Sequence, residues 1–160
     1  VFGLAPDATA RFATDGRPRD PRRTGRVLGR VQPGTAEAQD IATGLSAVES
    51  LAPFATGAGA VVIRRYVRAI EAAEGPLAML ERTSALRRQW GLRWRKAGVF
   101  VRRADAADDV SLVSGLLAQA ARLELGGMAV AGTAEALAAY EEAGRIADGL
   151  GLFLVVCEAL

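Results

Sequence analysis

Two basic groups in this 160-residue sequence have residue types and spacing suited to binding an anion. The first is the segment 82–103, which holds seven arginines and one lysine, includes both tryptophans and contains no acidic residue. Guanidinium groups bind phosphates and carboxylates through paired hydrogen bonds, and indole rings stack on bases. We therefore predict a surface for an acidic protein or a nucleic acid, formed by Arg87, Arg88, Trp90, Arg93, Trp94, Arg95 and Lys96.

The same segment has a structural interpretation that is equally good. Leu86, Trp90 and Trp94 lie four residues apart, which is the spacing of a core-facing helical stripe. The segment carries a net charge of +8, whereas residues 104–160 contain two arginines against nine acidic residues, a net of −7. If these two regions pack together, the basic charges are paired within the chain and little positive field is left for a partner.

The second basic group lies around Gly57 and Gly59, with Arg64 and Arg65 close behind in the sequence. A glycine-containing turn before a helix can hold a phosphate or carboxylate at the helix N-terminus. Val62 stands where a dinucleotide-binding fingerprint would have its third glycine, so a flexible interhelical loop is the competing interpretation.

The sequence excludes several common chemistries. It contains no histidine and one cysteine, so neither a Ser-His-Asp triad nor a structural zinc site can be built from this chain. Cys157 lies in an apolar run and is predicted to be a core residue. Two carboxylate pairs, Asp105 with Asp108 and Glu71 with Glu74, could act in acid–base or Mg²⁺ chemistry, but helix capping and ion pairing explain them as well. We assign no catalytic residue, metal or cofactor.

The elements that must position these residues are predicted to be mainly helices. The chain is rich in alanine, the best helix former, and apolar residues recur at helical spacing in five segments. The first helix follows Thr35 and ends before Pro53, and the last follows Thr133 as its N-cap. The predicted helices are therefore 35–52, 60–74, 77–96, a fourth beginning after Asp105 or Asp108, and 133–149.

These elements favour a mostly α fold, a bundle of about five helices with short extended pieces. The alternative is an α/β fold in which 99–101, 128–131 and 152–156 form a small parallel sheet, because these segments are rich in β-branched and other apolar residues. Residues 1–34, with their many arginines, glycines and prolines, are predicted to be a basic arm, and residues 35–160 a single globular helical domain.

The leading functional hypothesis is a non-enzymatic binding or regulatory protein that engages an acidic protein or a nucleic acid through the basic tryptophan segment. The first alternative is a small-molecule-binding or enzymatic α/β domain for a phosphate or carboxylate ligand. The second is a structural subunit of a larger assembly. The lone cysteine and the short apolar runs lead us to expect a cytoplasmic protein with no membrane partner, and a homo-oligomer is compatible with each hypothesis.

Overall fold

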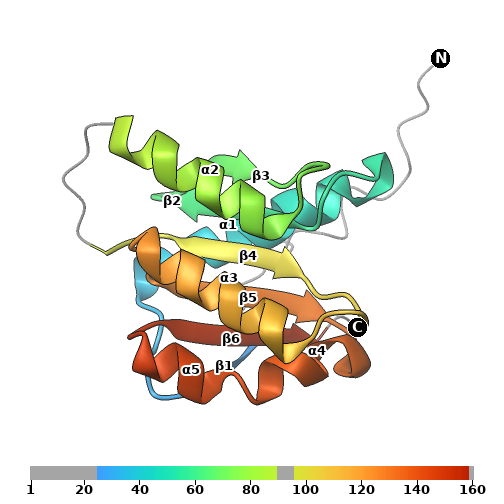
Figure 1. The fold of residues 1–160 in the computed structure, drawn as a ribbon, viewed down its shortest axis with the longest axis vertical. Helices are drawn as coiled ribbons and strands as arrows, with labels where there is room; N and C mark the ends of the chain where they lie inside the picture. Colours follow the sequence, from blue (N-terminus) through green and yellow to red (C-terminus); the bar gives the residue numbers. More distant parts are fainter. Residues whose placement is uncertain (1–24, 90–95, 159–160) are drawn as a thin grey trace, which may run out of the picture.

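The computed structural model describes residues 25–89 and 96–158. These residues form one six-stranded mixed sheet in the order β1-β6-β5-β4-β2-β3, with helices on both faces (Figure 1). The strands are β1 (Gly25–Leu28), β2 (Gly59–Ile63), β3 (Tyr66–Ile70), β4 (Val99–Arg103), β5 (Gly127–Gly132) and β6 (Phe153–Glu158). The helices are α1 (Thr35–Leu51), the short 3₁₀ turn η3 (Ala52–Phe54), α2 (Pro76–Gln89), α3 (Val110–Arg122), α4 (Ala134–Glu141) and α5 (Gly144–Gly149). The fold is α/β, so the prediction of a mostly helical bundle is wrong.

The centre of the sheet consists of three parallel strands, β4, β5 and β6. Their residues are almost all buried, because helices or loops cover both faces of a parallel sheet. A strand that is buried on both faces has a continuous apolar sequence without periodicity, and such a sequence is equally compatible with a buried helix and a buried strand. The three segments are those of the α/β alternative, and their parallel pairing confirms it.

The predicted helix 60–74 is instead a β-hairpin formed by β2 and β3. The helical face expected from Val62, Tyr66 and Ile70 does not form, because Val62 is buried in β2 whereas Tyr66 and Ile70 are exposed in β3. The turn of the hairpin is made by Arg64 and Arg65, which both have positive φ (52° and 68°). A two-residue hairpin turn needs this left-handed backbone. The sequence has no Asn-Gly or Asp-Gly pair at this position, which would usually indicate such a turn.

Strand β1 extends the sheet by pairing antiparallel with β6, where Gly25 faces Cys157. Residues 25–34 were assigned to the basic arm, so the structure incorporates this part of the arm into the globular fold. The rest of the predicted arm, residues 1–24, lies outside the described residues.

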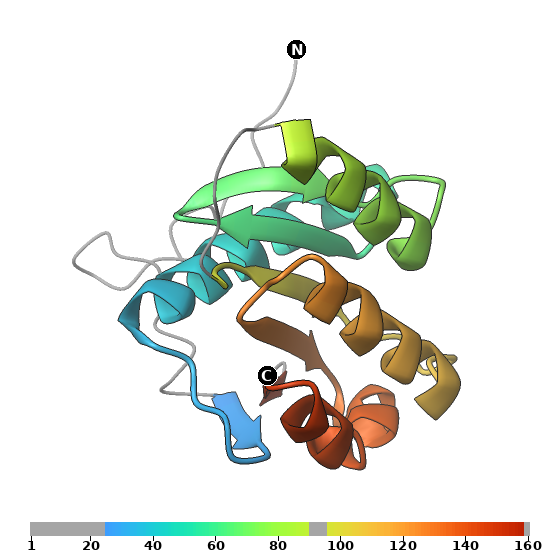
Figure 2. The ribbon, with the colours of Figure 1, turned by 60° about the vertical axis from the view of Figure 1, so that its left-hand side comes forward.

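The helices form a layer on each side of the sheet. Helix α1 crosses one face over β4 and β2, and its Ile41 packs with Val62, Val99 and Val101. The other face is covered by α2, α3, α4 and α5, as Figures 1 and 2 show from two directions. Because side chains alternate along a strand, Val99 and Val101 face α1 while Phe100 belongs to the core on the other face.

Local sequence signals predict some of the helix boundaries and miss others. The hydroxyl of Thr133 accepts a hydrogen bond from the Ala136 N–H (3.3 Å), which confirms the predicted N-cap. Helix α3 is capped by Asp109 rather than by Asp105 or Asp108. The predicted helix 133–149 is two helices, because α4 ends at Glu141 and α5 begins at Gly144. None of the helices in the described residues is long and apolar enough to cross a membrane.

Candidate functional site

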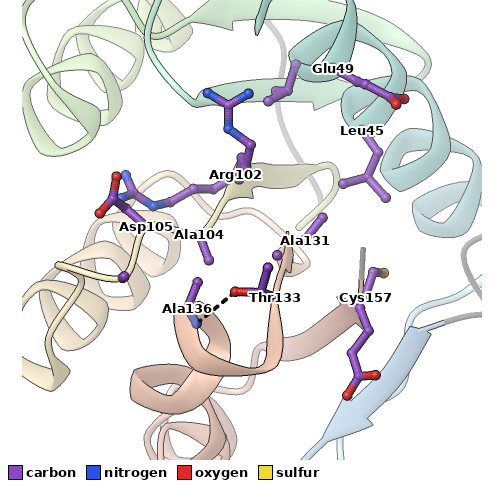
Figure 3. A pocket seen from close by; sticks show the side chains of 14 residues that line it. Leu45, Glu49, Arg102, Ala104, Asp105, Ala131, Thr133, Ala136 and Cys157 are labelled. Atoms are coloured by element: carbon purple, nitrogen blue, oxygen red, sulfur yellow. Dashed lines mark hydrogen bonds between the residues drawn. The ribbon is translucent and has the colours of Figure 1, made fainter. Parts of the chain in front are cut away.

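An open pocket of about 680 Å³ lies at the carboxyl ends of the three parallel strands. Figure 3 shows it between Leu45 and Glu49 of α1 on one side and Ala104, Thr133 and Ala136 on the other. The carboxyl edge of a parallel sheet is where open α/β folds bind their ligands, because the loops that follow the strands converge there. The complete lining is Leu45, Val48, Glu49, Arg102, Arg103, Ala104, Asp105, Ala106, Ala131, Gly132, Thr133, Ala136, Cys157 and Glu158.

The strand ends meet at this pocket because they are in register. Arg103 of β4 pairs with Ala131 of β5, and Ala131 pairs in turn with Cys157 of β6. A Cβ added at Gly132 would lie 2.9 Å from the Cβ of Ala104, so the end of β5 and the β4–α3 loop approach closely. Glycine at this position lets the two segments form one continuous wall of the pocket.

The pocket wall is apolar, with charged groups around it. Leu45, Val48 and several alanines supply the apolar surface, and Arg103, Glu49, Asp105 and Glu158 supply charges. Arg103 is exposed, and no ion pair joins it to another residue in the described parts 25–89 and 96–158. Its guanidinium is therefore available to an anionic group in the pocket.

Arg102, the neighbour of Arg103 in sequence, has a different environment. It is buried on the opposite face of the sheet, donates from Nε to the hydroxyl of Tyr140 (3.1 Å), and forms an ion pair with Asp108. The Tyr140 hydroxyl donates in turn to Asp108 Oδ2 (2.6 Å). Burial and the hydrogen bond to Asp108 raise the pKa of Tyr140, so its hydroxyl stays protonated and remains a donor.

Glu71 lies close to the same arginine, with its Oε2 4.0 Å from Arg102 Nη1. Burial raises the pKa of the Glu71 carboxyl, and the nearby Arg102 charge opposes that shift. The carboxylate also accepts a hydrogen bond from the Ala58 N–H (3.2 Å). Glu71 therefore has a structural partner on each side rather than an open position for a ligand.

The thiol of Cys157 lines the pocket but is nearly buried, with 5% of the residue exposed. Burial raises its pKa to about 11, so the reactive thiolate is scarce at neutral pH. The described residues contain no group of three His, Cys, Asp or Glu side chains placed to hold a metal ion.

Comparison with known families identifies the family of this chain. Residues 24–155 match the family described as the LpxI C-terminal domain. The chain belongs to the LpxI C-terminal domain family. A comparison with curated proteins finds no match. The family match begins just before β1 and ends within β6, so it covers every pocket-lining residue except Cys157 and Glu158.

In this LpxI C-terminal domain, the predicted anion-site residues lie in two separate places. Gly57 and Gly59 are at the start of β2, beside the end of β4, where Gly59 pairs with Arg102. Arg64 and Arg65 are at the opposite end of β2, in the hairpin turn. The backbone of Ala58 between the two glycines is bound by Glu71. The structure therefore does not bring the glycines and the arginines of this hypothesis together.

The predicted basic tryptophan surface is only partly within the described residues. Trp90, Arg93, Trp94 and Arg95 lie outside them. Of the others, Arg87 is buried, with Nη2 3.4 Å from the Glu124 carbonyl oxygen, and the Lys96 ammonium donates to the carbonyl of Gly151. Arg88 is exposed near the end of α2. Glu124 and Gly151 belong to the acidic region 104–160, so this region contacts Arg87 and Lys96, of which Arg87 is buried and Lys96 remains exposed.

Sequence reasoning did not identify Arg103 or the pocket. In the sequence Arg103 is one of eight basic residues of the segment 82–103, and the predicted strand 99–101 ends before it. The α/β alternative contains a signal that would have predicted the site. In that fold Arg103, Thr133 and Glu158 lie at or just beyond the carboxyl ends of successive parallel strands, where open α/β sheets bind their ligands.

Proposed function

We propose that this chain is a small-molecule-binding or enzymatic α/β domain that takes an anionic ligand, a phosphate or a carboxylate, in the pocket at the carboxyl ends of β4, β5 and β6. Its family is related to lipid A biosynthesis, which favours a role in that bacterial pathway. The observation that carries the proposal is the exposed Arg103 beside an open, largely apolar pocket of about 680 Å³. A pocket of this size and lining is typical of sites for small organic ligands.

The layout of the pocket supports a ligand with an anionic and an apolar part. The Arg103 guanidinium can form two parallel hydrogen bonds to a phosphate or carboxylate. Leu45, Val48 and the alanines can cover an apolar portion. The pocket also adjoins the N-terminus of α4, whose helix dipole favours negative charge nearby.

The carboxylates of the pocket limit the charge of the ligand and favour hydrogen-bond donors on it. Glu49, Asp105 and Glu158 accept hydrogen bonds but repel further negative charge. A ligand with one anionic group and several hydroxyl or amino donors therefore fits better than a polyanion. This charge layout also separates the proposal from nucleic-acid binding, which needs an extended positive surface.

Calorimetric titration with inorganic phosphate, hexyl phosphate and hexanoate tests the proposal. We expect hexyl phosphate to bind more tightly than inorganic phosphate, because its chain contacts the apolar wall. Arg103→Gln should weaken binding by about tenfold or more, the usual effect of losing a charge-assisted hydrogen bond. Arg65→Gln is the matched control, since it removes an exposed guanidinium at the far end of β2. Absence of binding, or equal binding by Arg103→Gln and the wild type, would contradict the proposal.

A further inference from the structure

A buried polar cluster lies directly beneath the rim of the pocket. It consists of Arg102, Asp108, Tyr140 and Glu71, and we refer to it as the Arg102 cluster. The Arg102 and Asp108 side chains are 6% and 3% exposed, and Tyr140 is fully buried. Arg102 contacts all three of the others, through the hydrogen bond to Tyr140, the ion pair with Asp108 and the 4.0 Å approach to Glu71.

Each member of the Arg102 cluster comes from a different segment at the carboxyl edge of the sheet. Arg102 belongs to β4, Asp108 to the β4–α3 loop and Tyr140 to α4, and Glu71 follows β3 directly. Three of these segments also supply residues to the pocket lining, namely β4, the β4–α3 loop and α4. The cluster therefore connects three parts of the pocket wall from behind.

Asp108 determines the shape of the β4–α3 loop. Its Oδ2 accepts a hydrogen bond from the Asp105 N–H (3.0 Å), and its own N–H donates to the Asp105 carbonyl (3.0 Å). The Asp105 carboxylate closes the turn by accepting from the Ala107 N–H (2.9 Å). Asp108 thus receives donors from two directions, Tyr140 on the core side and Asp105 on the pocket side.

Glu71 holds the neighbouring loop in a similar way. Its carboxylate accepts from the Ala58 N–H, and its carbonyl accepts from the Gly57 N–H (3.1 Å). The Ala58 carbonyl in turn accepts from the Arg103 N–H (2.8 Å). The backbone that carries the Arg103 side chain is therefore anchored to a loop that the Arg102 cluster holds in place.

A buried ionic cluster is a costly way to fill space, because charges lose their hydration and apolar residues of equal volume often stabilise a core as well. A buried polar cluster in which every hydrogen bond is satisfied holds its side chains, and the segments that carry them, in one fixed arrangement. Because the cluster lies behind the pocket, the segments that it holds in place are those of the pocket wall.

From these contacts we propose that Tyr140 and Arg102 are positioning residues for the pocket. They fix Asp108, and through it the loop that carries Ala104, Asp105 and Ala106, so that this wall and Arg103 are set for the anionic ligand. This inference rests on the proposed function. Arg102 is one of the lining residues, but its guanidinium is held by Tyr140 and Asp108, and Tyr140 does not line the pocket.

The test compares hexyl phosphate binding and amide hydrogen exchange in the wild type and four variants. Tyr140→Phe removes only the hydroxyl that joins Arg102 to Asp108. We expect it to weaken hexyl phosphate binding by about tenfold and to accelerate exchange of the Asp105 and Ala107 amides by a similar factor. Tyr66→Phe, which alters the exposed tyrosine of β3, should change neither quantity.

Asp40→Ala serves as the control for stability, because it weakens the fold at the hairpin turn at the other end of β2. If Tyr140 only stabilised the fold, a given loss in melting temperature would be accompanied by the same loss of hexyl phosphate affinity in Tyr140→Phe and in Asp40→Ala. Asp108→Asn repeats the test from the other side of the same hydrogen bond, in case Tyr140→Phe fails to fold.

The outcomes separate the inference from the proposed function. If the wild type does not bind hexyl phosphate, the proposed function is overturned and the inference falls with it. If the wild type binds and Tyr140→Phe binds equally well with unchanged exchange in 104–109, the inference alone is overturned. Weaker binding with faster exchange in that loop, absent from Asp40→Ala, supports both.

Discussion

The carboxylate of Asp40 in α1 accepts hydrogen bonds from the backbone N–H of Arg65 (2.6 Å) and from that of its neighbour Arg64 (3.1 Å). The two arginines form the β2–β3 turn, and their backbone adopts the left-handed conformation that glycine usually provides. Asp40 is 2% exposed, and burial raises the pKa of its carboxyl. A side chain from a preceding helix thus holds a turn whose own sequence does not favour it.

Replacing Asp40 should therefore destabilise the fold. We expect Asp40→Ala to lower the free energy of unfolding by about 1–3 kcal/mol, because two turn N–H groups lose their acceptor. Glu49→Ala, at an exposed acid of the same helix, should change it by less than about 0.5 kcal/mol. Urea unfolding followed by circular dichroism measures both. Equal effects of the two substitutions would show that Asp40 does not hold the turn.

Gly44 of α1 and Gly115 of α3 should respond oppositely to alanine. A Cβ at Gly44 of α1 would lie 2.5 Å from Cγ2 of Val101 and 2.9 Å from its Cβ, so α1 would have to move away from β4. We expect Gly44→Ala to destabilise the protein by about 1–3 kcal/mol through overpacking. At Gly115 of α3 the added Cβ would make an ordinary 3.4 Å contact with Leu77.

Gly115→Ala should therefore stabilise the protein by about 0.5–1 kcal/mol, the usual gain in helix propensity. Thermal unfolding of both variants gives the comparison. Stabilisation by both would indicate that α1 does not pack as closely on β4 as described.

Glu71 should make stability depend on pH in a defined direction. Its pKa is raised in the folded state, so between the ordinary pKa of Glu, about 4.3, and the raised value the folded chain binds the proton more tightly than the unfolded chain. In that interval this group adds stability as the pH falls. Glu71→Gln lacks the titration but keeps an acceptor for the Ala58 N–H.

The stability of the wild type relative to Glu71→Gln should therefore increase as the pH falls from 7 towards 4.5. The free energy of unfolding of each protein is measured by urea unfolding at each pH, and the value for Glu71→Gln is subtracted from that of the wild type. This difference removes most contributions of the other charges that face Glu71, which are Arg102, Glu74 and Asp108. A difference that is constant with pH, or that changes in the other direction, would mean that the carboxyl is not desolvated in the folded protein.

Cys157 should be unreactive although it lines the pocket. Its raised pKa, about 11 instead of the ordinary 9.0, leaves about a hundredfold less thiolate at pH 8. Labelling by a chromogenic disulfide reagent should thus be at least that much slower in the native protein than in urea. Since the chain has no other cysteine, the signal is specific, and Cys157→Ala gives the blank. Fast native labelling would show that the pocket opens to the thiol.

Several features of this protein could be predicted from local sequence. The end of α1 before Pro53 and the Thr133 cap follow signals carried by a few neighbouring residues, whereas α1 begins at Thr35 with Gly34 as its N-cap, one residue earlier than the predicted cap at Thr35. The absence of histidine and the single cysteine determine which catalytic groups the chain can assemble, whatever its fold. The apolar segments of β4, β5 and β6 were recognised as well, although helix and strand fit such runs equally until their packing is known.

Tertiary structure alone decided the sheet and the site. Whether 60–74 becomes a helix or a hairpin depends on Asp40, 24 residues before the turn begins at Arg64, and on pairing with β4. Arg102 and Arg103 are equivalent in the sequence, yet the alternation of a strand sends one into a buried cluster and leaves the other beside the pocket. The pocket itself joins residues from Leu45 to Glu158, because parallel strands bring the ends of distant segments to a single edge.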